Sequence, residues 1–217
     1  MPSHLPIFLN LRDKPCVVIG GGDVALRKVR SLLDCGARVR VIAPAVRPEL
    51  SELADAGRIE IEARGYRAGD LSAAFLGVAA ADDPEVNARA RQEASVRRVL
   101  INVADDPEGS DYQTPSFFED GPLTLALSTS GASPAVARTL RRMVQDWLGP
   151  DMGRALAVVG AFRDRVKNEV SDPKDRVRFW ETAVNAENLE LARKGDLAGF
   201  EDSLEAALAA FAARPHK

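Results

Sequence analysis

Apolar and alternating runs of strand length recur through the first half of the chain, with amphipathic stretches and turns between them. The runs predict strands at 16–20, 38–43, 58–62, 76–80 and 99–103. Helical spacing predicts helices between the glycine turn and Gly36, at 48–57 and at 84–97. The last of these helices opens with Asp83 as N-cap and Pro84 in the first helical position. This rhythm predicts an α/β fold with a Rossmann-like parallel sheet.

The pattern changes after a loop-like stretch at 106–109. A strand is predicted at 123–127, followed by a loop of small residues and a helix that Ser133 caps and Gly149 ends. Beyond Met152 the strand signal disappears, and 155–170 and 189–213 carry helical periodicity. We therefore expect a Rossmann domain at 1–113, a small α+β segment at 114–150 and an all-helical region at 151–217.

The segment that follows the first predicted strand carries the most specific motif. After Val17-Val18-Ile19 come Gly20-Gly21-Gly22-Asp23-Val24-Ala25, a Gly-x-Gly-x-x-Ala pattern between a strand and a helix. In that context the pattern is a dinucleotide-binding fingerprint, because the glycines let the backbone approach a pyrophosphate and the helix N-terminus offers free N–H groups. The alternative is an ordinary turn between a strand and a helix.

Composition narrows the classes of partner. The chain has 217 residues and a net charge of −3, which gives no reason to expect a nucleic acid or a membrane surface. No apolar stretch is long enough to span a bilayer, and the N-terminus lacks the pattern of a signal peptide. Cys16 and Cys35 form no CxxC pair and are typical of thiols in a reducing cytoplasm.

Acid–base chemistry is limited by the scarcity of histidine. The only two histidines, His4 and His216, lie near the ends of the chain. Acid–base chemistry must therefore fall mostly to carboxylates. Ligands of open α/β sheets bind beyond the carboxyl ends of the strands, which is where Asp105 follows the strand at 99–103. Asp105 is accordingly a candidate base, and the alternative is a loop aspartate that caps the turn before Pro107.

The residues after the second predicted strand leave the choice of cofactor open. This region reads Ile42-Ala43-Pro44 and lacks the acidic residue that commonly binds the ribose hydroxyls of NAD. Arg47 lies nearby and would suit a 2′-phosphate, although a solvated loop arginine is the alternative. The pattern alone does not decide between NAD and NADP.

The small-residue loop 128–133 is the second candidate for ligand binding. Its N–H groups precede a helix, and Arg138, Arg141 and Arg142 follow on that helix. This combination suits substrate carboxylates. The alternative is a connector followed by an ordinary basic helix face.

In their order along the chain, these motifs resemble the precorrin-2 dehydrogenase/sirohydrochlorin ferrochelatase family, the N-terminal dehydrogenase–chelatase module of siroheme synthase. The residues that carry the resemblance are Leu5–Phe8, Leu11-Arg12, Gly20–Ala25, Arg27-Lys28, Ala79–Asp83, Val86-Asn87, Asn102–Asp105, Pro115-Ser116, Ser128–Pro134, Ala137-Arg138, Arg163, Arg165–Lys167 and Arg178–Glu181. The resemblance spans nearly the whole chain.

The resemblance implies an oxidoreductase of siroheme biosynthesis that converts precorrin-2 to sirohydrochlorin with NAD as cofactor. It also implies a ferrochelatase step, in which Fe²⁺ enters as substrate and no metal resides in the protein. It places NAD contacts at Asp23, Val24, Pro44 and Ala45, next to the glycines of the turn. Asp105 matches the family's catalytic aspartate. Family members also lack the strand-two acid, so its absence here does not count against NAD.

For the substrate, the resemblance implies a tetrapyrrole with eight carboxylates. The residues expected to bind it are Ser128, Ser130, Ser133, Arg138 and Arg141.

The resemblance further implies an intertwined homodimer built from about 112–149. A serine that is phosphorylated in one branch of the family is Thr129 here, which puts modification in doubt. Some relatives are dehydrogenases only, and a non-catalytic NAD- or heme-handling module is a further alternative. Trifunctional members add a methyltransferase domain, so the chain is either a standalone enzyme or a module of a longer one.

Overall fold

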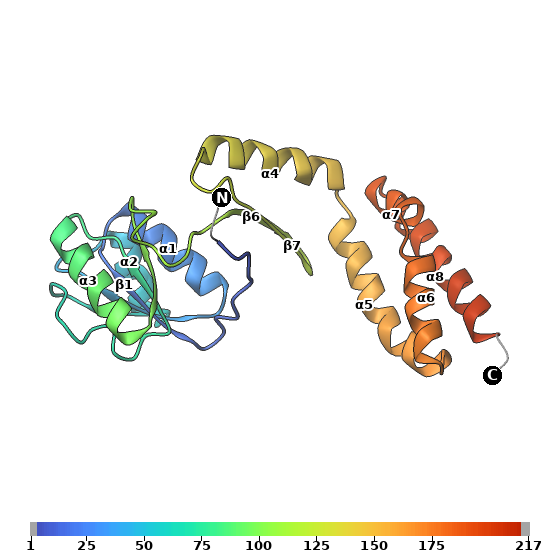
Figure 1. The fold of residues 1–217 in the computed structure, drawn as a ribbon, viewed down its shortest axis with the longest axis horizontal. Helices are drawn as coiled ribbons and strands as arrows, with labels where there is room; N and C mark the ends of the chain where they lie inside the picture. The colour runs from blue at the N-terminus through green and yellow to red at the C-terminus, as the bar shows by residue number, and fades with distance from the viewer. Residues whose placement is uncertain (1–3, 214–217) are drawn as a thin grey trace. The chain divides into compact units, whose positions relative to one another are not determined.

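The computed structural model describes residues 4–213, which form parts of two compact units, 1–114 and 115–217 (Figure 1). Each unit has a hydrophobic core of its own. The unit boundary at Thr114 lies next to the predicted end of the Rossmann domain at residue 113. His216 lies outside the described residues.

The first unit is built on a five-stranded parallel sheet. Its strands are β1 (Pro15–Ile19), β2 (Arg38–Ile42), β3 (Ile59–Glu62), β4 (Leu76–Ala79) and β5 (Leu100–Val103), in the order β3-β2-β1-β4-β5. The chain runs outward from β1 to β3 and then returns to place β4 on the other side of β1. This reversal makes a topological switch point between β1 and β4, where sheets of this kind bind ligands. The predicted Rossmann-like sheet is confirmed.

Helices cover both faces of this sheet. They are α1 (Asp23–Asp34), α2 (Pro48–Asp55) and α3 (Pro84–Arg97). Alternate residues of β1 point to opposite faces. Cys16 and Val18 belong to the core under α1, whereas Val17 and Ile19 belong to the core under α3. Figure 1 shows α1 and α3 on either side of β1. The strands are therefore buried on both faces, which explains why they read as apolar runs.

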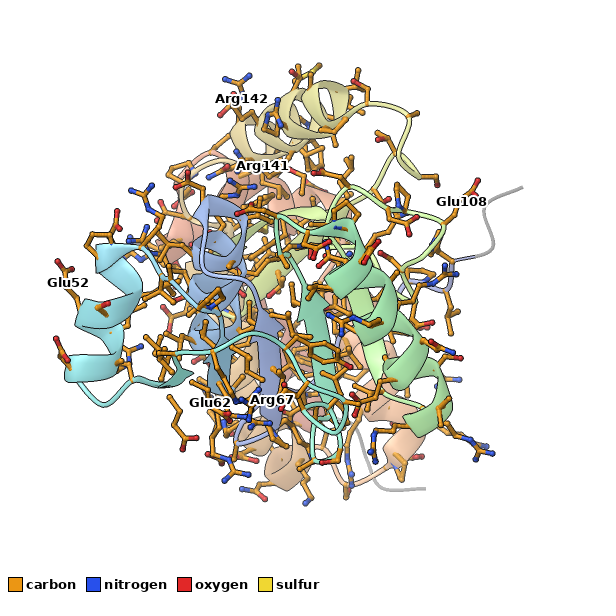
Figure 2. The ribbon with its side chains drawn as sticks, turned by 90° about the vertical axis from the view of Figure 1, so that its left-hand side faces the viewer. Glu52, Glu62, Arg67, Glu108, Arg141 and Arg142 are labelled. Atoms are coloured by element: carbon orange, nitrogen blue, oxygen red, sulfur yellow. The ribbon has the colours of Figure 1, made fainter. Side chains whose placement is uncertain are left out.

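The connection from β3 to β4 is the loop 63–75, which contains no helix. Hydrogen bonds and ion pairs among four charged residues hold this loop to the sheet. We call these residues the Asp70 cluster (Arg40, Glu62, Arg64 and Asp70). Arg64 donates two hydrogen bonds, of 2.8 and 2.9 Å, to the Asp70 carboxylate, and Arg40 donates to the Asp70 carbonyl at 2.8 Å. Both arginines also contact Glu62. The Arg67 amide donates to the Asp70 carboxylate at 2.7 Å. Figure 2 labels Glu62 and Arg67 on the segments that the cluster joins.

The second unit begins with an antiparallel hairpin and continues as helices. The elements are β6 (Ser116–Asp120), β7 (Leu123–Leu127), α4 (Pro134–Leu148), α5 (Met152–Glu169), α6 (Pro173–Ala183), α7 (Ala186–Arg193) and α8 (Leu197–Ala212). A core that includes Phe162, Phe179, Phe200 and Leu204 joins α5, α6 and α8. Among the described residues, no helix is long and apolar enough to cross a membrane.

The predicted all-helical region is confirmed, and the stretch of helical periodicity at 189–213 contains a break. The structure has the end of α7 and all of α8 there, with a turn between them. Gly195 has φ +86°, a left-handed conformation that ends a helix. Asp196 then accepts a hydrogen bond from the Gly199 amide and caps α8. The Lys-Gly-Asp sequence at 194–196 is the signal that periodicity alone overlooks.

Candidate active site

The glycine turn is fixed by the close approach of three loops. Gly20 has φ +124°, and a Cβ there would lie 2.1 Å from the Ala80 carbonyl oxygen. A Cβ on Gly21 would lie 2.1 Å from the Ala45 carbonyl oxygen. Both distances are far below contact, so only glycine fits at either position. Gly20 and Gly21 thus join the ends of β1, β2 and β4 at one edge of the sheet.

Gly22 differs from these two glycines because it faces open space. A Cβ there would meet nothing within 4 Å. Gly22 is the N-cap of α1, and no side chain caps the helix. The first N–H groups of α1 are therefore left for an external acceptor. The turn is thus closed on its protein side and open on the side where a pyrophosphate would bind, so these residues fit a dinucleotide.

The loop after β2 lies against the same turn. The Arg47 amide donates to the Gly21 carbonyl at 2.9 Å, and the Arg47 guanidinium lies 3.0 Å from the Asp23 carboxylate. Pro44 and Ala45, just before it, are exposed. The structure therefore brings the predicted cofactor residues of the glycine turn and of the β2 loop to one place. Their individual contacts with a cofactor stay predictions.

Arg47 is held between two carboxylates. Besides its ion pair with Asp23, it makes hydrogen bonds of 3.0 and 3.2 Å to Glu49. The hydrogen bond from Arg47 lowers the pKa of the Glu49 carboxyl. A 2′-phosphate would have to compete with both acids for this arginine.

A crevice of about 580 Å³ opens at the carboxyl ends of β4 and β5. This volume lies within the range of small-molecule sites. Val24 of α1 lines one part of it, residues 80–82 and 103–106 line the strand ends, and the first turns of α3 line the rest. Asp105 follows the end of β5 and lines this crevice, so it lies at the edge of the sheet where the sequence predicts it.

Asp105 occupies an unusual backbone conformation at this edge. Its φ is +60°, in the left-handed region that aspartate tolerates better than most residues. Its side chain is exposed and makes no hydrogen bond or ion pair with any of residues 4–213. The turn-capping role considered for Asp105 belongs to Asp106, whose carboxylate accepts from the Gly109 amide at 2.8 Å. Asp105 is thus left available for chemistry.

Two crevice residues on α3 are not among those predicted. Asn87 donates to the Ala81 carbonyl at 2.9 Å and accepts from the Ala81 amide at 3.0 Å, so it fixes the backbone after β4. Arg91 lies one helical turn further along and lines the same crevice. Their spacing of four residues, on a helix that begins at Pro84, puts both on one face, but it does not show that this face lines a crevice.

The predicted substrate loop belongs to the second unit. Ser133 caps α4 by accepting from the Val136 amide at 3.3 Å, and the Ser128 hydroxyl accepts from the Ser130 amide at 3.1 Å. The Thr129 hydroxyl donates to the Ser133 carbonyl and accepts from the Ser133 amide, each at 3.2 Å. Ser130 has φ +52°. The loop is therefore shaped by its own hydroxyl groups, and its role toward a substrate stays a prediction.

The arginines of α4 have few partners. Arg138 is exposed, and Arg141 donates to Gln145 at 2.9 Å one turn further along the helix. Figure 2 labels Arg141 and Arg142 on α4. Their role as carboxylate ligands also stays a prediction. In the part of the chain that the structure describes, no group of three or more potential ligands could hold a metal ion.

Three family models match the chain in succession. A model described as putative NAD(P)-binding matches residues 7–116, which is half of the chain. A model of the sirohaem biosynthesis protein central region matches 120–146, and one of the sirohaem synthase dimerisation region matches 151–208. The chain belongs to the siroheme synthase family. Its first unit is an NAD(P)-binding domain, as the glycine motif predicts.

Similar siroheme synthases cover most of this chain. The siroheme synthase of Chromobacterium violaceum is 39% identical over 208 residues, which make up 96% of this chain and 44% of that protein. Siroheme synthase 3 of Aeromonas hydrophila is 42% identical over 197 residues, which make up 90% of this chain and 42% of that protein. The chain thus spans less than half the length of these relatives.

A solved structure shares the fold. The chain titled SirC, precorrin-2 dehydrogenase, matches with a TM-score of 0.76 at 22% identity, over 94% of this chain and 100% of that one. Within the family, the model named for dimerisation covers α5, α6, α7 and most of α8, whereas the resemblance assigns the dimer to about 112–149. That assignment, and the predicted boundary at residue 150, stay predictions.

Proposed function

We propose that this chain is an NAD-dependent precorrin-2 dehydrogenase of siroheme biosynthesis. The oxidation removes a hydride and a proton from precorrin-2 and gives sirohydrochlorin, NADH and H⁺. Support comes from the siroheme synthase relatives and from the glycine turn, which is open at Gly22 and lies beside the crevice. The tie between Arg47 and its two acids favours NAD over NADP.

The observation that carries the proposal is the position of Asp105. Its carboxylate is exposed and without a partner among residues 4–213, and it lines the same crevice as Val24, which follows the glycine turn. Bound NAD supplies the hydride acceptor. The α1 N-terminus and Gly22 would hold its pyrophosphate, and Asn87 keeps the backbone of Ala81 in place. Asp105 accepts the proton that leaves the substrate.

The second unit carries the residues that we propose for substrate binding. Ser128, Ser130 and Ser133, with Arg138 and Arg141, would bind carboxylates of the tetrapyrrole, since arginine recognises carboxylates through paired hydrogen bonds. The chain would act as a homodimer, which the match to a dimerisation region supports. The apolar stripe on α4 has exposed members at Val136, Leu140 and Trp147, which suits an interface between two copies.

Iron insertion is the second activity that we propose. Fe²⁺ is then a substrate that displaces two pyrrole protons. Asp105 can accept them one at a time, because its exposed carboxylate can pass the first proton to water before it takes the second. The name siroheme synthase, carried by the relatives, supports this step. We further propose a cytoplasmic location, where a reducing environment suits the thiol of Cys16. Burial, together with Cys35, raises the pKa of that thiol to about 11 and keeps it protonated.

Two assays on the purified protein test these proposals in sequence. The first follows NADH formation from precorrin-2, and the second follows Fe²⁺ or Co²⁺ insertion into sirohydrochlorin in the absence of NAD. Activity in both supports a bifunctional enzyme. Activity in the first alone leaves a dehydrogenase without chelatase. A dimer that binds NAD and fails both assays is a non-catalytic module, and the proposal is then wrong.

A further inference from the structure

Arg91 stands apart from the other arginines of α3 that have assigned contacts. Arg89 stacks over the Tyr66 ring at 5.8 Å, and Arg97 forms an ion pair of 2.6 Å with Glu93. Arg91 is exposed, lines the crevice and has no hydrogen bond, ion pair or ring contact with any described residue, 4–213. An arginine that the fold itself does not use is available to a ligand.

The crevice otherwise carries negative charge. Asp82, Asp105 and Asp106 line it, and Arg91 is the one cation among its lining residues. A polycarboxylate that enters would be repelled by three acids unless a cation offsets them. Arginine suits this task because its planar guanidinium forms paired hydrogen bonds with a carboxylate.

Arg91 lies on the same face of α3 as Asn87, which contacts the loop after β4. Asn87, one turn before it, is bonded twice to Ala81, so the helix is held against the loop after β4. A pyrophosphate would bind at the uncapped N-terminus of α1, which contributes Val24 to the crevice lining. Arg91 lines the same crevice of about 580 Å³ as Asp105, so a ligand held by Arg91 there would lie near Asp105.

We propose that Arg91 binds one carboxylate of the tetrapyrrole and thereby positions the macrocycle beside Asp105. This rests on the proposed function and adds a substrate residue within the first unit. The substrate then has an anchor on the same helix that shapes the crevice.

Titration with sirohydrochlorin tests this proposal on the whole protein, followed by absorbance or tryptophan fluorescence. Arg91→Gln should weaken sirohydrochlorin binding about tenfold, the effect of losing one charge-assisted pair. Arg91→Lys should recover part of the loss. Arg89→Gln removes the same charge from the same helix outside the crevice, and it should stay within about twofold of wild type. NAD affinity and the melting temperature should be unchanged in Arg91→Gln.

Turnover gives an independent measurement. In Arg91→Gln the KM for precorrin-2 should rise about tenfold while kcat stays within about threefold, because the residue binds substrate and takes no part in proton transfer. Equal sirohydrochlorin affinity in wild type and Arg91→Gln overturns the proposal, and so does a loss confined to NAD. A wild-type protein that binds no tetrapyrrole contradicts the proposed function itself, which separates the two failures.

Discussion

Two groups of charged residues in the first unit are arranged in opposite ways. In the Asp70 cluster each carboxylate is engaged, and Asp70 is the one charged residue among 4–213 that is buried. In the crevice, Asp105 and Arg91 are exposed and have no partner among the described residues. Charges that are satisfied by the protein hold its fold, whereas charges left unsatisfied at a strand end are available to a ligand.

The Asp70 cluster stabilises the fold because it holds the loop 63–75, which connects β3 to β4 without a helix. Glu93 of α3 extends the same fastening from the other side. It accepts from the Tyr66 hydroxyl at 2.5 Å and from the amides of Gly69 and Leu71 at 2.9 and 3.3 Å. Burial acts to raise the pKa of Glu93, but these hydrogen bonds, together with one from Arg97, outweigh it and lower the pKa. The loop 63–75 is thus tied to both β3 and α3.

The largest effect is expected at Asp105. Asp105→Asn removes the proposed base, so NADH formation should fall at least about 100-fold, the lower end of the range for general-base catalysis. NAD affinity and the melting temperature should be unchanged, because the carboxylate has no partner among residues 4–213 and asparagine also tolerates the left-handed conformation. Full turnover would remove Asp105 from the mechanism and break the contrast between the two regions.

Asp70→Asn should show the reverse pattern. It breaks the paired hydrogen bonds with Arg64, so the free energy of unfolding should fall by about 2 kcal/mol, less than for a fully buried pair because Arg64 is partly exposed. Turnover at a temperature where the variant remains folded should be normal. Urea unfolding and steady-state kinetics measure the two quantities. Lost turnover in a stable variant would show that the cluster also serves the site.

Acid should weaken the same cluster. The hydrogen bonds from Arg64 lower the pKa of Asp70 below its ordinary value. The stability that this gives is fully present above the unfolded carboxyl pKa of about 3.9 and is lost as the pH falls through the lowered, folded value. The wild type should therefore lose more stability than Asp70→Asn between about pH 4 and pH 2. Parallel unfolding curves for the two proteins would contradict this assignment.

The strand ends could be predicted from sequence because their signals are local. An apolar run followed by Gly20 or by Asp83-Pro84 determines where a strand stops and a helix starts, and topology then places Asp105 at the ligand edge. The hairpin strand β6 (Ser116–Asp120) has too little alternation to stand out. The Asp70 cluster could not be predicted from the sequence because its ion pairs join β2, β3 and a loop. The spacing of residues along the chain does not indicate contacts between separate elements.

The crevice residues on α3 could not be predicted from the sequence for a related reason. Arg91 reads as one more arginine on a charged helix, and only the partners of its neighbours set it apart. Sequence shows which residues carry charge, but the free or engaged state of each charge depends on tertiary contacts. The choice between ligand residue and solvated residue is therefore made by the fold.

The smallest effect is expected at Gly22, and it tests whether the open side of the turn receives a ligand. Gly22→Ala places a methyl group where no protein atom lies within 4 Å, at φ −86°, so the fold should tolerate it. NAD affinity should fall about fivefold, because the methyl group occupies space that the pyrophosphate needs. Gly65→Ala is the matched control: its Cβ also meets nothing within 4 Å, but it lies in the loop of the Asp70 cluster. Calorimetric titration should find wild-type NAD affinity there. Equal affinity in both variants would mean that the cofactor does not approach the backbone at Gly22, and the open turn would then be no part of the site.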